Sequence, residues 1–175
     1  DAMIVVTSRD IEKGVRRGIG RKDDYHLIRS ALPLDQFDPT WFDGKQVRRE
    51  LGLPEDARVL GNVGRFSSQK NPLDWVRVAS RVAREIPDCH FLLVGDGPLR
   101  PKVEQLLEKE GLSERTIMPG LRRDVGRMLS AMDVFLLTSL WEGLPRVIPQ
   151  ALAMRVPVVT TGADGAMHIR GGRSN

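Results

Sequence analysis

The sequence has few of the residues on which disulfide-rich or metal-binding proteins depend. Its 175 residues include one cysteine, Cys89, which excludes an internal disulfide and suits a reducing compartment. Cys89 stands close to an apolar run that starts at Phe91, and this position favours an inert core thiol over a nucleophile. The histidines lack the spacing of metal ligands, since they stand at His26, His90 and His168. We therefore expect no metal site and a cytoplasmic location.

Long hydrophobic runs and aromatic residues are also scarce. No stretch approaches the roughly 18 consecutive apolar residues of a membrane-spanning helix. Residues 1–7 lack the basic start and the longer apolar run of a signal peptide. The aromatic residues are three Trp, five Phe and one Tyr, and they do not alternate with lysine and arginine as a single-stranded nucleic-acid platform requires. We therefore expect no dedicated nucleic-acid binding.

The charge balance is basic, with 27 Lys and Arg against 23 Asp and Glu. A surface of this kind attracts phosphorylated ligands and anionic lipid. Its clusters are short, as at Arg16–Arg17, Arg48–Arg49 and Arg122–Arg123. Phosphate-bearing ligands fit this composition, and it permits peripheral contact with a membrane surface.

Short apolar segments alternate with amphipathic ones from about residue 58 onward. The pattern predicts strands near residues 59–63, 91–94, 116–118, 134–137 and 156–160, and helices near residues 72–85, 98–110, 124–131 and 145–154. The strands are apolar throughout, which is typical of strands that helices bury on both faces. We therefore predict an α/β fold with a Rossmann-like parallel sheet and helices on both faces. Right-handed crossovers would bring every strand-to-helix loop to one edge, where such sheets bind ligands.

The beginning of the chain follows a shorter pattern of the same kind. It predicts a strand at residues 4–7, a helix at residues 9–17 and a second strand at residues 25–30. Residues 32–39 cannot be helical throughout, because each proline pushes the residue before it toward extended geometry. This segment is therefore a linker or the entry to another domain.

The loop after the strand at residues 59–63 contains two cations. Gly64 permits a tight turn, and Arg65 and Lys70 flank polar residues before the next helix. An arginine fork and a lysine point charge suit phosphate oxygens, and the start of the helix adds free N–H groups. The order of residues is not that of a P-loop. A solvated surface pair is the alternative to a phosphate site.

Two further loops contain glycines. The segment Gly95-Asp96-Gly97-Pro98 lacks the third glycine of a dinucleotide fingerprint and indicates a structural turn. After residues 116–118, Gly120 would let a flat base approach main-chain donors and acceptors. Asp124 is suited to cap the next helix.

The loop from Thr138 to Pro145 contains a carboxylate, Glu142, directly before Gly143. A helix that Pro145 opens would make this loop favourable for an anion, with Glu142 free to accept hydrogen bonds from sugar hydroxyls. Gln150 would lie on that helix about two turns further on, so that the two polar groups could hold a sugar and a ribose on either side of a diphosphate. The alternatives are a Glu142 that only stabilises the helix dipole and a solvent-exposed Gln150.

Together these loops resemble the C-terminal, donor-binding domain of GT-B-fold retaining glycosyltransferases of family four, the glycosyl transferases group 1. The resemblance runs from about Val59 to Asp164. Its motifs, in order, are Gly64-Arg65 with Lys70, Leu93 to Pro98, Gly120 before Arg122-x-Asp124-Val125, Ser139-x-x-Glu142-Gly143-Leu144-Pro145, and Pro157 to Thr160. Residues 1–40 look like the end of the family's N-terminal domain and its linker, and residues 41–175 like the nucleotide-sugar-binding domain.

The resemblance implies a role for each loop. Arg65 and Lys70 would bind the donor diphosphate and stabilise charge on the leaving nucleotide, and Glu142 would contact hydroxyls of the transferred sugar. The other implied contacts are the tight turn at Gly64, the loop of Gly120, Leu121 and Arg122 beside the base, and the backbone of Gly143 and Leu144 beside the phosphates. The implied ligand is a UDP- or GDP-linked sugar, with no metal, cofactor or protein nucleophile.

Two departures from the family pattern affect the expected activity. Gln150 stands where the family has a second glutamate that holds the ribose; an amide still accepts and donates hydrogen bonds, but without charge assistance. The acceptor domain is missing, and the sequence stops at Gly171–Asn175, where the family continues with another strand and helices. The resemblance therefore implies a fragment of an enzyme that binds donor weakly and transfers little or nothing.

Other functions are known on the same fold. A sugar-nucleotide epimerase would need acid and base carboxylates and histidines in the site, and a phosphorylase would need a pyridoxal-phosphate lysine; neither pattern is visible. A non-catalytic nucleotide-sugar-binding or scaffold module stays open, because of Gln150 and the missing partner domain.

Overall fold

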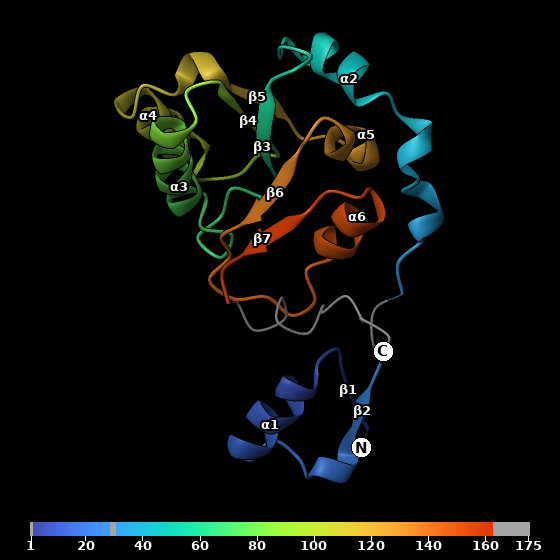
Figure 1. Cartoon of the computed structure of the whole chain (residues 1–175). Helices are drawn as coiled ribbons and strands as arrows, with labels where there is room; N and C mark the ends of the chain where they lie inside the picture. The colour runs from blue at the N-terminus through green and yellow to red at the C-terminus, as the bar shows by residue number, and fades with distance from the viewer. Residues whose placement is uncertain (1, 29–30, 163–175) are drawn as a thin grey trace.

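A parallel five-stranded sheet forms the centre of the molecule (Figure 1). The computed structural model describes residues 2–28 and 31–162. Across the sheet the strands follow the order β5 (Thr116–Gly120), β4 (Cys89–Val94), β3 (Arg58–Val63), β6 (Val134–Leu137) and β7 (Val158–Thr160). Every neighbouring pair is parallel. The predicted Rossmann-like sheet is confirmed.

The strand order reverses at the centre of this sheet. The chain places β4 and β5 on one side of β3, and then returns to place β6 and β7 on the other side. The carboxyl ends of β3 and β6 therefore flank the point of reversal, which is where open α/β sheets bind ligands. The loops that follow these two strands contain Lys70 and Glu142.

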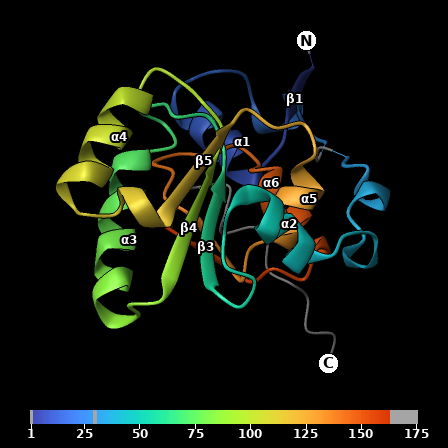
Figure 2. The same cartoon turned by 90° about the horizontal axis from the view of Figure 1, so that it is seen from above.

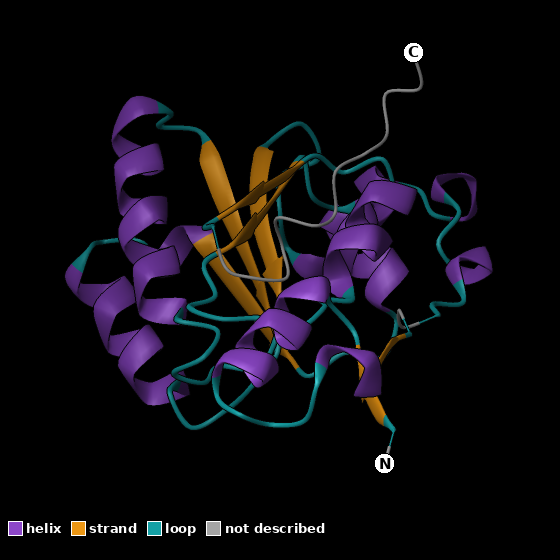
Figure 3. Ribbon diagram, turned by 90° about the horizontal axis from the view of Figure 1, so that it is seen from below, coloured by secondary structure: helices purple, strands orange, loops and turns teal. Residues whose placement is uncertain are grey.

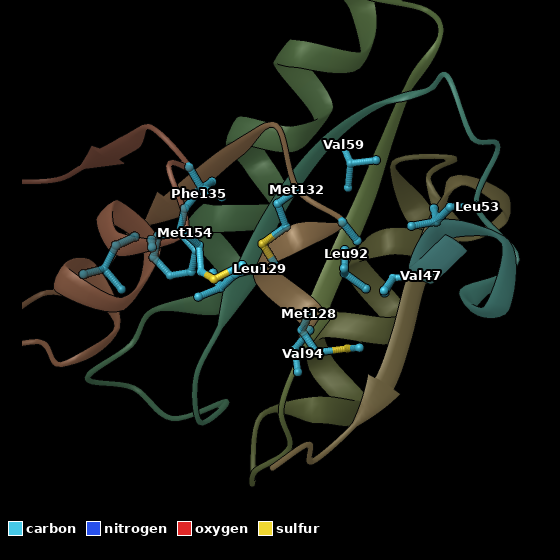
Figure 4. Close-up of a cluster of buried hydrophobic side chains, with 14 of the residues drawn as sticks. Val47, Leu53, Val59, Leu92, Val94, Met128, Leu129, Met132, Phe135 and Met154 are labelled. Atoms are coloured by element: carbon cyan, nitrogen blue, oxygen red, sulfur yellow. The ribbon is translucent and has the colours of Figure 1, made fainter. Parts of the chain in front are cut away.

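Helices cover both faces of the sheet (Figures 2 and 3). One face packs against α3 (Pro72–Glu85) and α4 (Arg100–Lys109), and the other against α2 (Gly44–Leu51), α5 (Val125–Ser130) and α6 (Val147–Ala153). In β4, Leu92 and Val94 belong to the buried cluster on the α2–α5–α6 face (Figure 4), whereas Phe91 and Leu93 belong to the cluster under α3 and α4. Each such side chain contributes roughly 1.5–3 kcal/mol by its burial. The strand is apolar at every one of these positions because both of its faces are buried.

The first residues form a separate unit with two parallel strands. β1 (Met3–Val5) and β2 (Tyr25–Leu27) pair with each other and are joined by α1 (Ser8–Arg16) and the short 3-10 turn η1 (Lys22–Asp24). Figure 1 shows this unit facing the edge at which the strands of the large sheet end. α1 begins one residue earlier than predicted because of a capping box: Thr7 Oγ1 accepts from the Asp10 N–H at 3.2 Å, and Asp10 Oδ2 accepts from the Thr7 N–H at 3.1 Å. The predicted end of the second strand, Ser30, lies outside the described residues.

Helix α2 is an element that the sequence analysis did not predict. Two 3-10 turns, η2 (Leu34–Gln36) and η3 (Pro39–Trp41), lead to it. Asp43 caps its first turn by accepting from the Lys45 N–H at 2.9 Å, and Gly52 ends it with a left-handed backbone of φ 77°. These are usual signals of a helix start and end. Val47 packs into the core, so α2 covers part of the sheet.

The remaining boundaries agree with the prediction to within a few residues. α3 and β6 have the predicted ranges, whereas α6 begins at Val147 and not near Pro145. A 3-10 turn, η4 (Ser113–Arg115), precedes β5. The end of the resemblance at Asp164 and the final segment Gly171–Asn175 lie outside the described residues. Each helix of the described part is too short or too polar to cross a lipid bilayer.

Candidate functional site

Two loops meet where the strand order reverses. One follows β3 (residues 64–71) and the other follows β6 (residues 138–146). The Leu140 N–H donates to the Gln69 carbonyl at 2.8 Å, and the Gln69 side-chain amide donates to the Trp141 carbonyl at 3.0 Å. These bonds fix the two loops against each other, although they are far apart in the sequence.

Lys70 and Glu142 form an ion pair between these loops. Lys70 Nζ lies 2.5 Å from Glu142 Oε1, and the exposed fraction of the side chain is 25% for Lys70 and 6% for Glu142. Within residues 2–28 and 31–162, the Glu142 carboxylate has no other hydrogen-bond or ion-pair partner. A buried charge without a partner is costly. Lys70 therefore offsets the charge of Glu142 and fixes its position.

A hollow of about 480 Å³ surrounds this pair. We call it the Glu142 pocket, and its lining consists of Val63, Lys70, Glu142, Leu144, Pro145, Arg146, Val147 and Gln150. Gln150 thus faces the same hollow as Glu142, but it lies about one turn into α6 and not two, because α6 begins only at Val147. Gly143 is not part of the lining. It lies beside the N-terminal unit, since a Cβ atom on Gly143 would stand 3.6 Å from Val6 Cγ2.

A second hollow of about 540 Å³ adjoins the first. We call it the Arg65 pocket, and its lining consists of Val63, Gly64, Arg65, Val94, Gly95, Asp96, Gly97, Leu121 and Arg122. Val63 lines both pockets, so they meet at the end of β3. Arg65 is exposed, and its guanidinium has no hydrogen-bond or ion-pair partner in the described part of the chain. The structure therefore places the two predicted phosphate cations in neighbouring pockets and not in a single one.

The outward position of Arg65 follows from the burial of its neighbour. Phe66 lies within the cluster under α3 and α4. Its N–H donates to the Asp96 carbonyl at 2.9 Å, and its own carbonyl accepts from the Leu99 N–H at 3.0 Å. With Phe66 fixed inward by packing and by both of its backbone groups, Arg65 extends toward solvent.

Gly95 and Gly97 allow two loops to approach this closely. Their φ angles are +136° and +155°. A Cβ atom on Gly95 would stand 1.9 Å from the Gly64 carbonyl oxygen, and one on Gly97 would stand 2.6 Å from that of Phe66. The segment is the predicted structural turn, and its glycines let the loop after β4 pack against the loop that contains Arg65.

Arg122 is bound by Asp124 and is not free in the Arg65 pocket. Its Nε and Nη2 donate to the two Asp124 carboxylate oxygens at 2.9 Å and 2.7 Å. These hydrogen bonds are the main reason why the pKa of Asp124 is lower than usual. Asp124 stands at the N-cap of α5 but its side chain makes no capping bond, so the predicted capping role is wrong. Gly120 lines neither pocket, and Leu121, 79% exposed, is the apolar residue at the rim.

Two charged residues of these pockets were missed by the sequence analysis. Arg146 is exposed and lines the Glu142 pocket. Asp96 lines the Arg65 pocket, and its Oδ1 accepts from the Gly97 N–H at 2.7 Å. The available signal was their position within the predicted loops. No group of three or more His, Cys, Asp or Glu in the described residues is placed to hold a metal ion.

Two curated proteins illustrate the similarity in sequence. The Vi polysaccharide biosynthesis protein VipC/TviE of Salmonella typhi is 43% identical over 108 residues, which cover 62% of this chain and 19% of that protein. The UDP-Gal:alpha-D-GlcNAc-diphosphoundecaprenol alpha-1,3-galactosyltransferase of Escherichia coli is 34% identical over 142 residues, which cover 79% of this chain and 37% of that enzyme. The chain therefore spans less than half the length of these relatives.

Solved structures show the same fold. Anabaena Alr3699/HepE in complex with UDP-glucose superposes with a TM-score of 0.86 at 24% identity, over 98% of this chain and 47% of that one. The glycosyltransferase WaaG, involved in lipopolysaccharide biosynthesis, superposes with a TM-score of 0.83 at 20% identity, over 95% of this chain and 46% of that one. Residues 43–171 match the family described as glycosyl transferases group 1. The chain belongs to this family, family four of the glycosyltransferases, and has the fold of the C-terminal half of a GT-B enzyme.

Proposed function

We propose that this chain is the donor-binding domain of a retaining glycosyltransferase, which transfers a sugar from a UDP- or GDP-linked donor to an acceptor hydroxyl. The observation that carries the proposal is the Lys70–Glu142 pair at the reversal of the strand order, next to the Arg65 pocket. Cations suit a diphosphate, and a carboxylate suits sugar hydroxyls. The UDP-glucose complex of HepE, which shares the fold, is consistent with this class of ligand.

The adjoining pockets suit different parts of such a donor. The diphosphate lies over Val63 and Gly64, where Arg65 reaches it from one pocket and Lys70 from the other. The base lies at the rim of the Arg65 pocket, beside Leu121. The shared lining residue between the pockets supports a ligand that extends through both.

The Glu142 pocket takes the sugar end of the donor. Glu142 accepts hydrogen bonds from hydroxyls of the transferred sugar, and the backbone at Leu144 faces the phosphates. Gln150 reaches the ribose from this pocket, because the ribose stays next to the diphosphate at Val63, where the two pockets meet. The presence of Glu142, Leu144 and Gln150 in one lining supports this assignment.

The reaction needs little from the protein beyond binding and charge. The bond between the sugar C1 and the β-phosphate oxygen breaks, the acceptor oxygen bonds to C1, and the acceptor proton passes to the departing phosphate. Negative charge grows on the diphosphate during this step. Arg65 and Lys70 are the cations that stabilise this charge, more in the transition state than in the bound donor.

The acceptor is bound by another part of a longer protein. We assign residues 1–40 to the end of an acceptor domain and its linker, and residues 41–175 to the donor domain. The separate β1–β2 pair supports this division, as does the short distance from Gly143 to Val6. The chain by itself then binds donor weakly and transfers little, and the whole enzyme works in the cytoplasm or at a membrane surface.

Ligand titration tests the proposal. UDP, GDP, UDP-glucose and GDP-mannose are titrated by calorimetry against the wild type, Arg65→Ala and Lys70→Ala. We expect one nucleotide class to bind and both substitutions to weaken it. Binding that both substitutions leave unchanged would contradict the proposal.

A non-catalytic nucleotide-sugar-binding module is the second candidate, and Gln150 is the observation that favours it. Gln150→Glu would then raise donor affinity without producing any turnover. For the enzyme, donor hydrolysis by the longer protein that contains this chain is expected, and Arg65→Ala is expected to abolish it. Binding without hydrolysis in that protein would favour the module.

A further inference from the structure

Lys70 and Glu142 bind each other, and the proposed donor must bind both of them. Lys70 is the only polar partner of Glu142 in the described residues, and the Glu142 side chain is 6% exposed. A diphosphate that takes up Lys70 competes directly with this carboxylate. A ligand that binds Lys70 therefore also changes how well the buried Glu142 carboxylate is stabilised.

The two forms of the nucleotide differ in what they offer Glu142. A nucleotide sugar brings hydroxyl donors into the Glu142 pocket, and these can replace the Lys70 ammonium as partners of the carboxylate. A free nucleoside diphosphate brings none, and its terminal phosphate has an additional ionisable oxygen. The Glu142 carboxylate is then left buried beside a phosphate of the same charge. This is unfavourable because the carboxylate is desolvated and weakly paired, and because the two negative charges repel each other.

We propose that the Lys70–Glu142 pair makes the site select the intact nucleotide sugar over the nucleoside diphosphate product. This inference rests on the proposed function. Cations matched to a leaving diphosphate favour tight binding of that product, and Glu142 opposes this once the sugar has left. The pair thus promotes product release, and Glu142 is a specificity-determining residue as well as a sugar contact.

The other groups of the Glu142 pocket do not take over the role of Lys70. Arg146 lines the pocket but is exposed, and it forms no ion pair with Glu142. Gln150 lines the same pocket without a hydrogen bond to Glu142. Loss of Lys70 to a phosphate therefore has no compensation from these two side chains.

Affinity measurements with Glu142→Gln test the inference. UDP and UDP-glucose are titrated by calorimetry, or GDP and GDP-mannose if the site takes guanine. The amide keeps the shape of the side chain but has no charge, so we expect UDP to bind about tenfold more tightly, a gain of about 1.4 kcal/mol. UDP-glucose affinity should change less, so that the preference for the sugar form falls. Glu108→Gln makes the same change of charge on the exposed side of α4 and should leave both affinities unchanged.

A double variant distinguishes an effect of the Lys70–Glu142 ion pair from a general effect of charge or of folding. In a Lys70→Gln background the ion pair is already lost, so a further Glu142→Gln change should tighten UDP much less than it does in the wild type. Thermal unfolding of each variant shows that the folded protein is being compared.

The outcomes distinguish the inference from the proposed function. If the wild type binds UDP and UDP-glucose but Glu142→Gln weakens both equally, or leaves their ratio unchanged, the selection role is wrong and the donor site stands. If the wild type binds no nucleotide of either base, the result contradicts both the selection role and the proposed donor site.

Discussion

Arg48 Nη2 donates to Asp133 Oδ2 at 2.9 Å, which joins α2 to the residue before β6 across 85 positions of the sequence. The same guanidinium donates to the carbonyl oxygens of Glu55, Ala57 and Ala131, each at 2.9 Å. The Arg48 side chain is only 11% exposed. One arginine therefore joins α2 to backbone carbonyls that precede β3 and β6.

Arg48→Met is expected to lower the free energy of unfolding by about 2–3 kcal/mol, because it removes the donor from several partly buried carbonyls at once. Urea denaturation measures this loss. Arg49→Met is the matched control, since Arg49 is exposed and, within the described residues, pairs only with the half-exposed Glu55; it should leave the midpoint nearly unchanged. Equal losses in the two variants would show that the carbonyl contacts of Arg48 contribute nothing specific.

Gly95→Ala is expected to disturb both stability and donor binding. Its Cβ atom would collide with the Gly64 carbonyl, and this would push apart the loops that position Arg65. Gly111→Ala provides the comparison, because Gly111 also has a positive φ but nothing lies near its Cβ position. Gly111→Ala should lose about 1 kcal/mol of stability from its left-handed backbone. Gly95→Ala should lose more, because of the collision, and only Gly95→Ala should also weaken nucleotide binding in a titration.

Arg65→Ala and Lys70→Ala are both expected to lower donor affinity, but they are expected to differ in their effect on stability. Each removes a charge-assisted contact to phosphate, and we expect a loss of affinity of about tenfold or more. Arg65 has no partner in the described residues, so its removal should leave the unfolding midpoint unchanged. Removal of Lys70 leaves Glu142 buried without its partner and should lower the midpoint.

Calorimetry and thermal unfolding on the same samples check this contrast. Arg77→Ala, at an exposed arginine of α3 that pairs with Asp74, is the control for loss of a cation. A lower midpoint for Arg65→Ala would show that this side chain has a structural partner after all.

The Arg122–Asp124 pair predicts a pH dependence of stability. The pKa of Asp124 is lowered, chiefly by the hydrogen bonds from Arg122, and therefore lies below the value of about 3.9 for a free aspartate. The stabilisation is complete above that value and is lost as the pH falls through the folded pKa. The midpoint difference between the wild type and Asp124→Asn should therefore shrink in acid, below about pH 4.

Unfolding midpoints at neutral pH and in acid measure this difference. Asp88→Asn, at an exposed aspartate outside both pockets, controls for the change of charge. A midpoint difference for Asp124→Asn that stays constant with pH would show that the pair does not stabilise the fold.

The core of the fold could be predicted because its signals are local and periodic. The apolar run at residues 91–94 has this composition since alternate side chains enter the clusters on opposite faces of the sheet. Because all strands of the sheet are parallel, the loops that contain Lys70 and Glu142 reach the same edge of the sheet. α2 escaped prediction because it is short and depends on tertiary contacts through Val47 and Arg48, so that Asp43 and Gly52 are its only clear local signals.

Side-chain directions in the site could not be predicted from the same signals. Whether Arg65 and Lys70 face one pocket or two depends on Phe66, whose burial turns its neighbour outward. Whether Asp124 caps a helix or binds Arg122 depends on competition between two nearby donors for one carboxylate. Sequence spacing leaves such choices open, because they are made by packing and by small differences in hydrogen-bond energy.

The reversal of strand order has a consequence for how the ligand site comes into being. Lys70 and Glu142 are 72 positions apart, and they meet because β6 pairs beside β3, although β4 and β5 come between these strands in the sequence. Such a contact has a large loop-closure cost, and it forms only when distant segments have paired. A peptide that contains one of the two loops cannot reproduce the pair, so nucleotide binding reports the finished assembly of the sheet and stabilises that assembly by mass action.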